Sequence, residues 1–295
     1  PKSWAEPALH LPLGVAGDIF THPEALAYID GEIIASADRY HHTIEVPEAY
    51  SDGAEHRLLL HGWTGLSGWP PDRADPSQLL LRECAVVDLD RGLQDFVMLA
   101  ETALDLSGHM NDNRPEKHAI LSALDAAFLA LDTRDPMEEG FRASIAPAME
   151  RLSYGLKTAA PPLDITLHAA GHAHMDVAYL WPMAQIRQKN ARTYSNVLRL
   201  MERHKEMHFS HSQPQRYAWT AEDYPEIFDG IRERVAEGRW EVLGGMWVEP
   251  DANMPGAEAL VRQLLLARRY CDETFGEDTQ CPVLWLPDTF GFPAC

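Results

Sequence analysis

Two segments far apart in the chain carry residues that could bind a metal ion. His174 and Asp176 stand two residues apart, and Asp288 follows much later. Alternate side chains of an extended segment point to one face, so His174 and Asp176 would lie together. Each segment follows an apolar, strand-like run, and active sites are built where the strands of a barrel or open α/β sheet end. One histidine with two aspartates suits zinc with a position left for substrate.

His172 shares the predicted face of His174 and Asp176, so it is a rival ligand. Our preferred interpretation is that His172 orients the ligands without binding the metal. A His-x-Asp pair alone is a weak signal, because a histidine at a strand end is more often a structural residue. The prediction depends on the combination with Asp288 at the end of a second strand-like run.

Polar and aromatic residues near the ends of these runs could bind sugar. Indole rings commonly stack on pyranose rings, although core packing is the alternative for each tryptophan. Glu249 and Asp251 offer carboxylates, with loop or capping roles as the alternative. We predict substrate contacts for Trp181, Gln213, Trp247, Asp251 and Phe290.

The elements that must position these residues change in character along the chain. Residues 1–88 are predicted to form a β-rich accessory domain, in which Asp30-Gly31 is the type I′ turn of a hairpin. In residues 89–160 the apolar residues recur with the period of a helix, and the region ends in a Pro-rich linker. Residues 161–295 alternate strands and helices, which predicts right-handed βαβ units and a parallel sheet.

The expected fold class is therefore α/β and multi-domain, ending in the N-terminal half of an irregular parallel (β/α) barrel, truncated at residue 295. The barrel strands are predicted at residues 165–170, 207–211, 240–245 and 282–286, and its helices at residues 182–206, 221–238 and 258–274.

Composition limits the classes of partner. The formal net charge of -20 argues against nucleic acid and anionic membranes, because both need a basic face. It fits a neutral substrate such as a sugar. No apolar run approaches transmembrane length, and the first residues have no apolar signal core. The four cysteines show no CxxC spacing, which is typical of free thiols in a reducing cytoplasm, so we expect a cytoplasmic protein.

Residues 168–293 closely resemble the catalytic domain of glycoside hydrolase family 38, the α-mannosidases. The resemblance is carried by Gly-His-Ala-His-Met-Asp-Val-Ala-Tyr-Leu-Trp-Pro (171–182), Ser-Gln-Pro-Gln (212–215), Gly-Gly-Met-Trp-Val-Glu-Pro-Asp (244–251) and Trp-Leu-Pro-Asp-Thr-Phe-Gly-Phe (285–292). It implies that His174, Asp176 and Asp288 are zinc ligands and that Asp288 is also the nucleophile of a retaining hydrolysis. It further implies terminal α-mannosides of oligosaccharides or glycoconjugates as substrates.

In this family the fourth zinc ligand, a histidine, and the acid/base aspartate lie downstream of the nucleophile motif, beyond Cys295. We therefore expect residues 1–295 alone to be inactive and to self-associate through an uncovered strand edge. Two other functions stay open. One is a metal-dependent polysaccharide deacetylase, in which Asp288 is a ligand or base. The other is a non-catalytic carbohydrate-binding module that uses Trp63 and Trp69.

Overall fold

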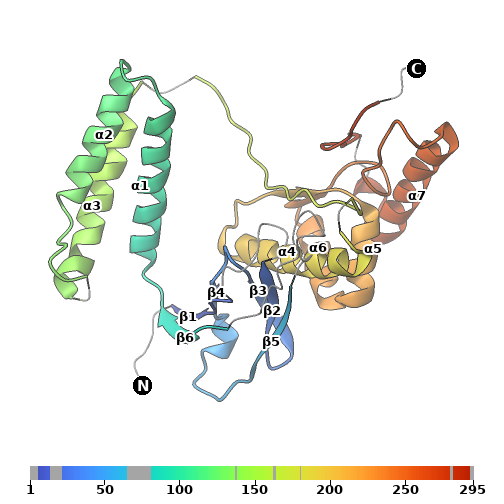
Figure 1. The fold of residues 1–295 in the computed structure, drawn as a ribbon, viewed down its shortest axis with the longest axis horizontal. Coiled ribbons are helices and arrows are strands. Elements are labelled where there is room, and N and C mark those ends of the chain that lie inside the picture. The colour runs from blue at the N-terminus through green and yellow to red at the C-terminus, as the bar shows by residue number, and fades with distance from the viewer. Residues whose placement is uncertain are drawn as a thin grey trace, which may run out of the picture. The chain divides into compact units, whose positions relative to one another are not determined.

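The chain divides into two compact units, each with its own elements (Figure 1). The computed structural model describes residues 6–13, 22–64, 81–136, 138–161, 164–179, 181–279 and 282–292. One unit comprises Pro1–Glu6 and Asp88–Leu167, and the other comprises Pro7–Val87 and His168–Cys295. Helices and strands both occur, so the fold is mixed α/β as expected. The division into three domains at residues 88 and 160 stays a prediction.

The unit around residues 88–167 is a bundle of three helices that lie side by side (Figure 1). Its helices are α1 (Arg91–His109), α2 (Pro115–Phe128) and α3 (Glu139–Thr158). The Asp90 side chain caps α1 by accepting the backbone N–H of Leu93 at 3.0 Å. Pro115 occupies the first turn of α2, where its missing N–H leaves no bond unmade. The prediction of a helical region here is confirmed.

The other unit begins with two small sheets. In one, β2 (Pro23–Ile29) pairs antiparallel with β3 (Glu32–Ala37) and with β5 (Leu58–Thr64). Asp30 and Gly31 join β2 to β3 with φ angles of 52° and 96°, so the predicted two-residue turn is confirmed. In the other sheet, β1 (Pro7–His10) lies between β4 (Thr43–Glu45) and β6 (Ala85–Asp88).

After residue 168, short parallel segments alternate with helices. The strands β7 (Phe209–His211) and β8 (Trp240–Val242) pair in parallel. Gly171 forms a parallel bridge to Phe209, and Gly244 forms one to Leu284, so four successive segments lie side by side in chain order. The helices between them are α4 (Met183–Arg203), α5 (Pro214–Asp223), α6 (Pro225–Ala236) and α7 (Ala257–Phe275).

Two sequence predictions in this region are wrong in detail. The segments at 165–170 and 282–286 form no regular strand beyond the bridges at Gly171 and Leu284. Ile165 and Leu167 are 62% and 84% exposed, so no layer formed by the described residues covers their apolar side chains. The helix predicted at 221–238 is two helices, α5 and α6. They meet at Tyr224 because Pro225 cannot donate the backbone hydrogen bond that a continuous helix needs.

One hydrophobic core joins the N-terminal sheet to the parallel segments. It contains Leu26 and Trp63 from the sheet, Tyr194 and Met201 from α4, and Trp240 from β8. Helix α4 packs on β3, which fixes the sheet beside the segments that carry the candidate metal ligands. Among the described residues, no helix is long and apolar enough to cross a membrane.

Candidate metal centre

The segment that carries His174 is held beside β7. The N–H of Gly171 donates to the His208 carbonyl at 2.8 Å, and the N–H of Ser210 donates to the Gly171 carbonyl at 2.8 Å. His211 extends this contact, because its Nε2 lies 3.1 Å from the Ala173 carbonyl. Since a carbonyl can only accept, Nε2 carries the proton. These hydrogen bonds fix the backbone of residues 171–173 and thereby the position from which the His174 side chain extends.

Burial keeps His211 in this neutral form. Its side chain is fully buried, and the Tyr194 hydroxyl lies 3.1 Å from its Nδ1. Burial lowers the pKa of His211 well below its usual value, and the nearby positive charge of Arg216 lowers it further. His211 is thus a fixed hydrogen-bonding residue that supports the chain between His172 and His174.

Gln213 and Arg216 hold the next turn of the same segment. The Gln213 side-chain amide and one Arg216 guanidinium nitrogen each donate to the Met175 carbonyl at 2.7 Å. The Gln213 oxygen also accepts the backbone N–H of Glu249 at 3.3 Å. Gln213 has a φ of 70°, which is uncommon for a residue other than glycine, and it is only 1% exposed. Its amide therefore joins two loops internally and is not presented to the open side of the site.

The three predicted zinc ligands come together. The His174 Nε2 atom lies 3.0 Å from Asp176 Oδ1 and 3.7 Å from Asp288 Oδ2. One ligand atom from each residue lies within 4.8 Å of the other two. The side chains of His174, Asp176 and Asp288 are 34%, 25% and 51% exposed, so this group is accessible. Their roles as ligands stay predictions.

Glu249 approaches His174 from the other side of the imidazole ring. Its Oε2 lies 3.3 Å from His174 Nδ1, and the Ser212 hydroxyl donates to its Oε1. Burial raises the pKa of Glu249, while the Ser212 hydrogen bond and the charge on His174 act in the opposite direction. The sequence leaves Glu249 with two alternatives, a functional carboxylate or a loop or capping residue, and does not place it beside His174. Its place in the block that follows β8 is the signal that could have indicated more.

The donor set fits a divalent cation. Three carboxylates, those of Asp176, Asp288 and Glu249, surround a single imidazole. Even a protonated His174 would leave an excess of negative charge, which a bound cation would offset. One nitrogen and two oxygens form a mixed set that zinc accepts.

The structure is compatible with both roles considered for His172, as a metal ligand or as a residue that orients the ligands. Its Nδ1 lies 2.8 Å from the Ser210 carbonyl and must donate to it, so Nε2 is the lone-pair nitrogen. That Nε2 is buried and has no hydrogen-bond partner among the described residues. His172, His174 and Glu249 also form a second group of ligand atoms within 4.8 Å of one another.

The predicted sugar-binding residues divide into two groups. Trp181 lines the same cleft as His174 and Asp176, and Phe290 is 69% exposed near the Asp288 turn. Trp247 instead donates its Nε1 to the Gln215 side chain and packs against Tyr270 of α7.

Asp251 is also occupied, because it accepts the backbone N–H of Asn253 at 2.8 Å. Asn253 in turn meets the Asp288 turn at Gly291, whose φ is 141°. A Cβ at Gly291 would lie 1.9 Å from the Asn253 side-chain nitrogen, so this approach requires glycine.

The structure removes one of the two tryptophans on which the carbohydrate-module hypothesis depends. Trp63 is 8% exposed and donates its Nε1 to Glu24 at 2.9 Å, so its ring is not available for sugar stacking. Trp69 lies outside the described residues.

Similarity to known proteins falls on the same part of the chain. Residues 164–295 match the glycosyl hydrolases family 38 N-terminal domain. The chain is 43% identical over 129 residues to Alpha-mannosidase 2C1 of Homo sapiens, covering 44% of this chain and 12% of that protein. It is 31% identical over 265 residues to Alpha-mannosidase of Saccharomyces cerevisiae, covering 82% of this chain and 23% of that protein. A shorter match, 39% over 61 residues, covers 21% of this chain and 6% of Lysosomal alpha-mannosidase of Bos taurus. The chain thus spans only a minor part of the length of each relative. Residues 164–295 are therefore similar to the N-terminal domain of glycosyl hydrolase family 38.

Proposed function

We propose that the protein containing this chain is a zinc-dependent, retaining α-mannosidase that hydrolyses terminal α-mannosides. The observation that carries this proposal is the convergence of His174, Asp176 and Asp288 within the part of the chain that matches family 38. The names of the relatives, which are α-mannosidases, support the substrate class. The parallel order of the segments bridged at Gly171 and Leu284 supports a (β/α) barrel with the group at its strand ends.

His174, Asp176 and Asp288 would hold the zinc, and the bound ion would supply a Lewis acid for sugar hydroxyls. Glu249 Oε2, 3.3 Å from His174 Nδ1, would accept a hydrogen bond from the Nδ1–H, which would leave the Nε2 lone pair facing the two aspartates. Gln213 and Arg216 would keep this geometry by fixing the Met175 carbonyl. These buried contacts would preorganise the site before substrate arrives.

Asp288 would act as the nucleophile. Its carboxylate is 51% exposed and would attack the anomeric carbon while the glycosidic bond breaks, forming a covalent glycosyl ester. The leaving oxygen would take a proton from a second carboxyl group, which in retaining enzymes lies about 5–5.5 Å from the nucleophile. By the family resemblance, that second residue follows Asp288 in the sequence. Water would then hydrolyse the ester with net retention.

The deacetylase alternative has no supporting observation, because the similarity is to α-mannosidases. A cytoplasmic location and self-association stay predictions, and lysosomal α-mannosidases are also among the relatives.

The test uses the longest natural protein that contains residues 1–295. We expect it to hydrolyse 4-nitrophenyl α-D-mannopyranoside and Asp288→Ala to lower kcat by at least about a thousandfold, because loss of the nucleophile removes the covalent step. The matched control is Asp229→Ala, an aspartate whose side chain is 73% exposed on α6. Proton NMR in the first minutes should show α-mannose as the first product. A variant at Asp288 with near-normal kcat, or initial release of β-mannose, would contradict the proposal.

A further inference from the structure

A cleft of about 390 Å³ extends from the candidate metal centre to the N-terminal sheet. His174, Asp176 and Trp181 line one part of it, and Asp38 and Tyr40, which follow β3, line another. A cleft of this size is within the range of small-molecule sites. Residues of the predicted accessory region therefore share one cavity with two of the predicted zinc ligands, His174 and Asp176.

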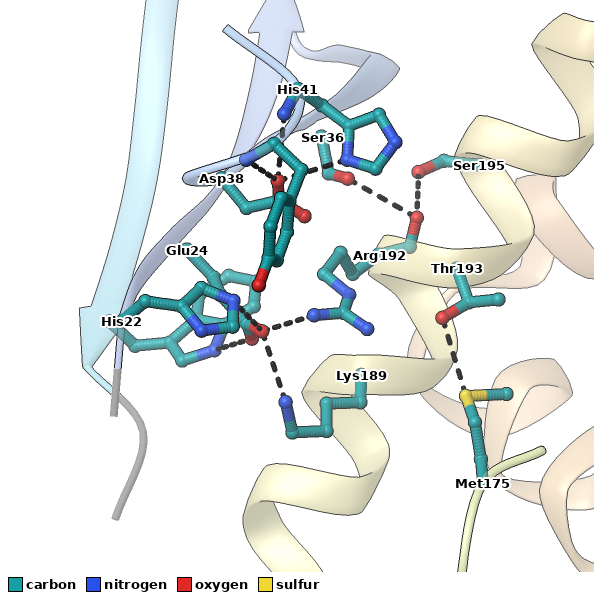
Figure 2. A network of polar contacts seen from close by, with 12 residues as sticks. His22, Glu24, Ser36, Asp38, His41, Met175, Lys189, Arg192, Thr193 and Ser195 are labelled. Carbon is teal, nitrogen blue, oxygen red and sulfur yellow. Dashed lines mark hydrogen bonds and ion pairs between the residues drawn. The ribbon is translucent and has the colours of Figure 1, made fainter. Parts of the chain in front are cut away.

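A buried ion network fixes this wall of the cleft. Glu24 of β2 is 1% exposed, accepts Lys189 Nζ at 3.0 Å and pairs with Arg192, both from α4 (Figure 2). Burial alone would raise the pKa of Glu24, but its His22 contact and the charges of Arg192 and Lys189 outweigh burial and lower that pKa to about 2. The sheet and α4 are thus held together at the cleft by charged groups that stay ionised.

Polar groups of this wall keep unused hydrogen-bonding capacity. Arg192 pairs with Glu24 through one terminal nitrogen, and its other nitrogens have no hydrogen-bond partner within the described part of the chain. Its side chain is 22% exposed, so these donors are accessible. His22, which is 5% exposed and also lines the cleft, has a buried Nδ1 without a described partner. The Tyr40 side chain is 63% exposed and contributes an aromatic surface.

This chemistry suits a neutral, hydroxyl-rich ligand. Lys189 and Arg192 pair with Glu24, and His41 pairs with Asp38, so these positive groups of the wall already have carboxylate partners and would not select an anion. A guanidinium donor beside an aromatic ring can bind hydroxyl groups and the apolar face of a sugar. We infer that this wall binds a second sugar residue of an oligomannoside, next to the sugar at the metal centre. This inference rests on the proposed function and deepens it, because the N-terminal sheet would then take part in substrate selection.

The test measures binding in the longest natural protein that contains this chain. Calorimetry compares methyl α-D-mannopyranoside with a sulfur-linked α-mannobiose, which resists hydrolysis. We expect the wild type to bind the disaccharide more tightly, and Tyr40→Ala to remove about tenfold of that preference. The matched control, Tyr154→Ala, alters a tyrosine that is 71% exposed on α3 and should keep the preference. Arg192→Lys retains a cation for Glu24 while removing the guanidinium, so it should weaken only disaccharide binding, with an unchanged Tm.

The outcomes separate the two proposals. Equal disaccharide preference in the wild type and Tyr40→Ala, alongside normal hydrolysis of the aryl mannoside, would overturn the inference and leave the enzyme function standing. A preference that Tyr40→Ala removes, in a protein that hydrolyses no mannoside, would support the cleft and overturn the enzyme function. Loss of both sugars' binding in Tyr40→Ala at an unchanged Tm would also overturn the inference, because the effect would not be confined to the second sugar.

Discussion

Two clusters of charged residues in the same unit have opposite designs. Around Glu24, one carboxylate meets Lys189 and Arg192, and the Glu24 side chain is buried. Around His174, three carboxylates meet one imidazole, and Asp288 is half exposed. In the first cluster the charge of the carboxylate is fully offset by cations, whereas the second leaves negative charge that a bound cation would offset.

This contrast separates a structural role from a functional one on physical grounds. A buried carboxylate is tolerated only when it is paired and hydrogen bonded, and Glu24 meets that condition through α4 and Trp63. The His174 group does not meet it, yet Gln213, Arg216 and His211 fix its backbone through buried hydrogen bonds. Rigid support for an electrostatically incomplete group is what a preorganised binding site requires.

Removal of the Glu24 charge should give the largest effect on folding. Glu24→Gln would leave Lys189 and Arg192 without their shared counter-charge, and we expect a loss of roughly 3 kcal/mol in the free energy of unfolding. Chemical denaturation at pH 7 measures it. The control is Glu55→Gln, because Glu55 is exposed. A loss no larger than that of the control would show that the network contributes little.

The pH dependence of the same two proteins sharpens this result. The pKa of Glu24 is lowered from 4.5 to about 2 in the folded chain, so the unfolded chain binds the proton more readily between these values. The contribution of Glu24 is therefore complete above 4.5 and is lost as pH falls toward 2. The difference in stability between the wild type and Glu24→Gln should shrink across this window. A stability difference that stays constant between pH 4.5 and 2 would contradict a lowered pKa of Glu24 as its cause.

A smaller effect is expected from Glu249, because it acts through His174. Glu249→Gln keeps the size of the side chain but removes the charge beside His174 Nδ1, and we expect zinc affinity to fall by about 10–100-fold. Competition with a chelator of known affinity measures it in the longest natural protein. The control is Glu241→Gln, since Glu241 accepts a serine hydroxyl at 2.8 Å but lies outside the candidate ligand groups. Equal affinities in the two variants would remove Glu249 from the site.

Local sequence signals predicted the local features well. Asp30-Gly31 gave the correct turn because two positive φ angles at a hairpin demand such residues. Gly238, the last residue of the helix predicted at 221–238, has a φ of 72° just after α6, which is the conformation that glycine favours at the end of a helix. The predicted ligands His174 and Asp176 lie close to Asp288, as the strand-end argument requires.

Features that depend on packing could not be read from local patterns. The alternation in residues 165–170 resembles a strand, but a strand needs a covering layer, and Leu167 is exposed. Gln213 and Trp63 are residue types that often bind sugar, yet tertiary contacts turn both into the interior. Which polar residue at a strand end faces solvent is decided by neighbours distant in sequence, such as Met175 for Gln213.

The central claim is that His174, rather than His172, shares a divalent cation with Asp176 and Asp288. Metal analysis by mass spectrometry of the longest natural protein, purified with zinc, tests it most directly. We predict that the wild type contains zinc, that His174→Ala and Asp176→Ala lose most of it, and that His172→Ala retains most of it. Zinc-loaded His174→Ala beside zinc-free His172→Ala, with all variants folded, would contradict the account.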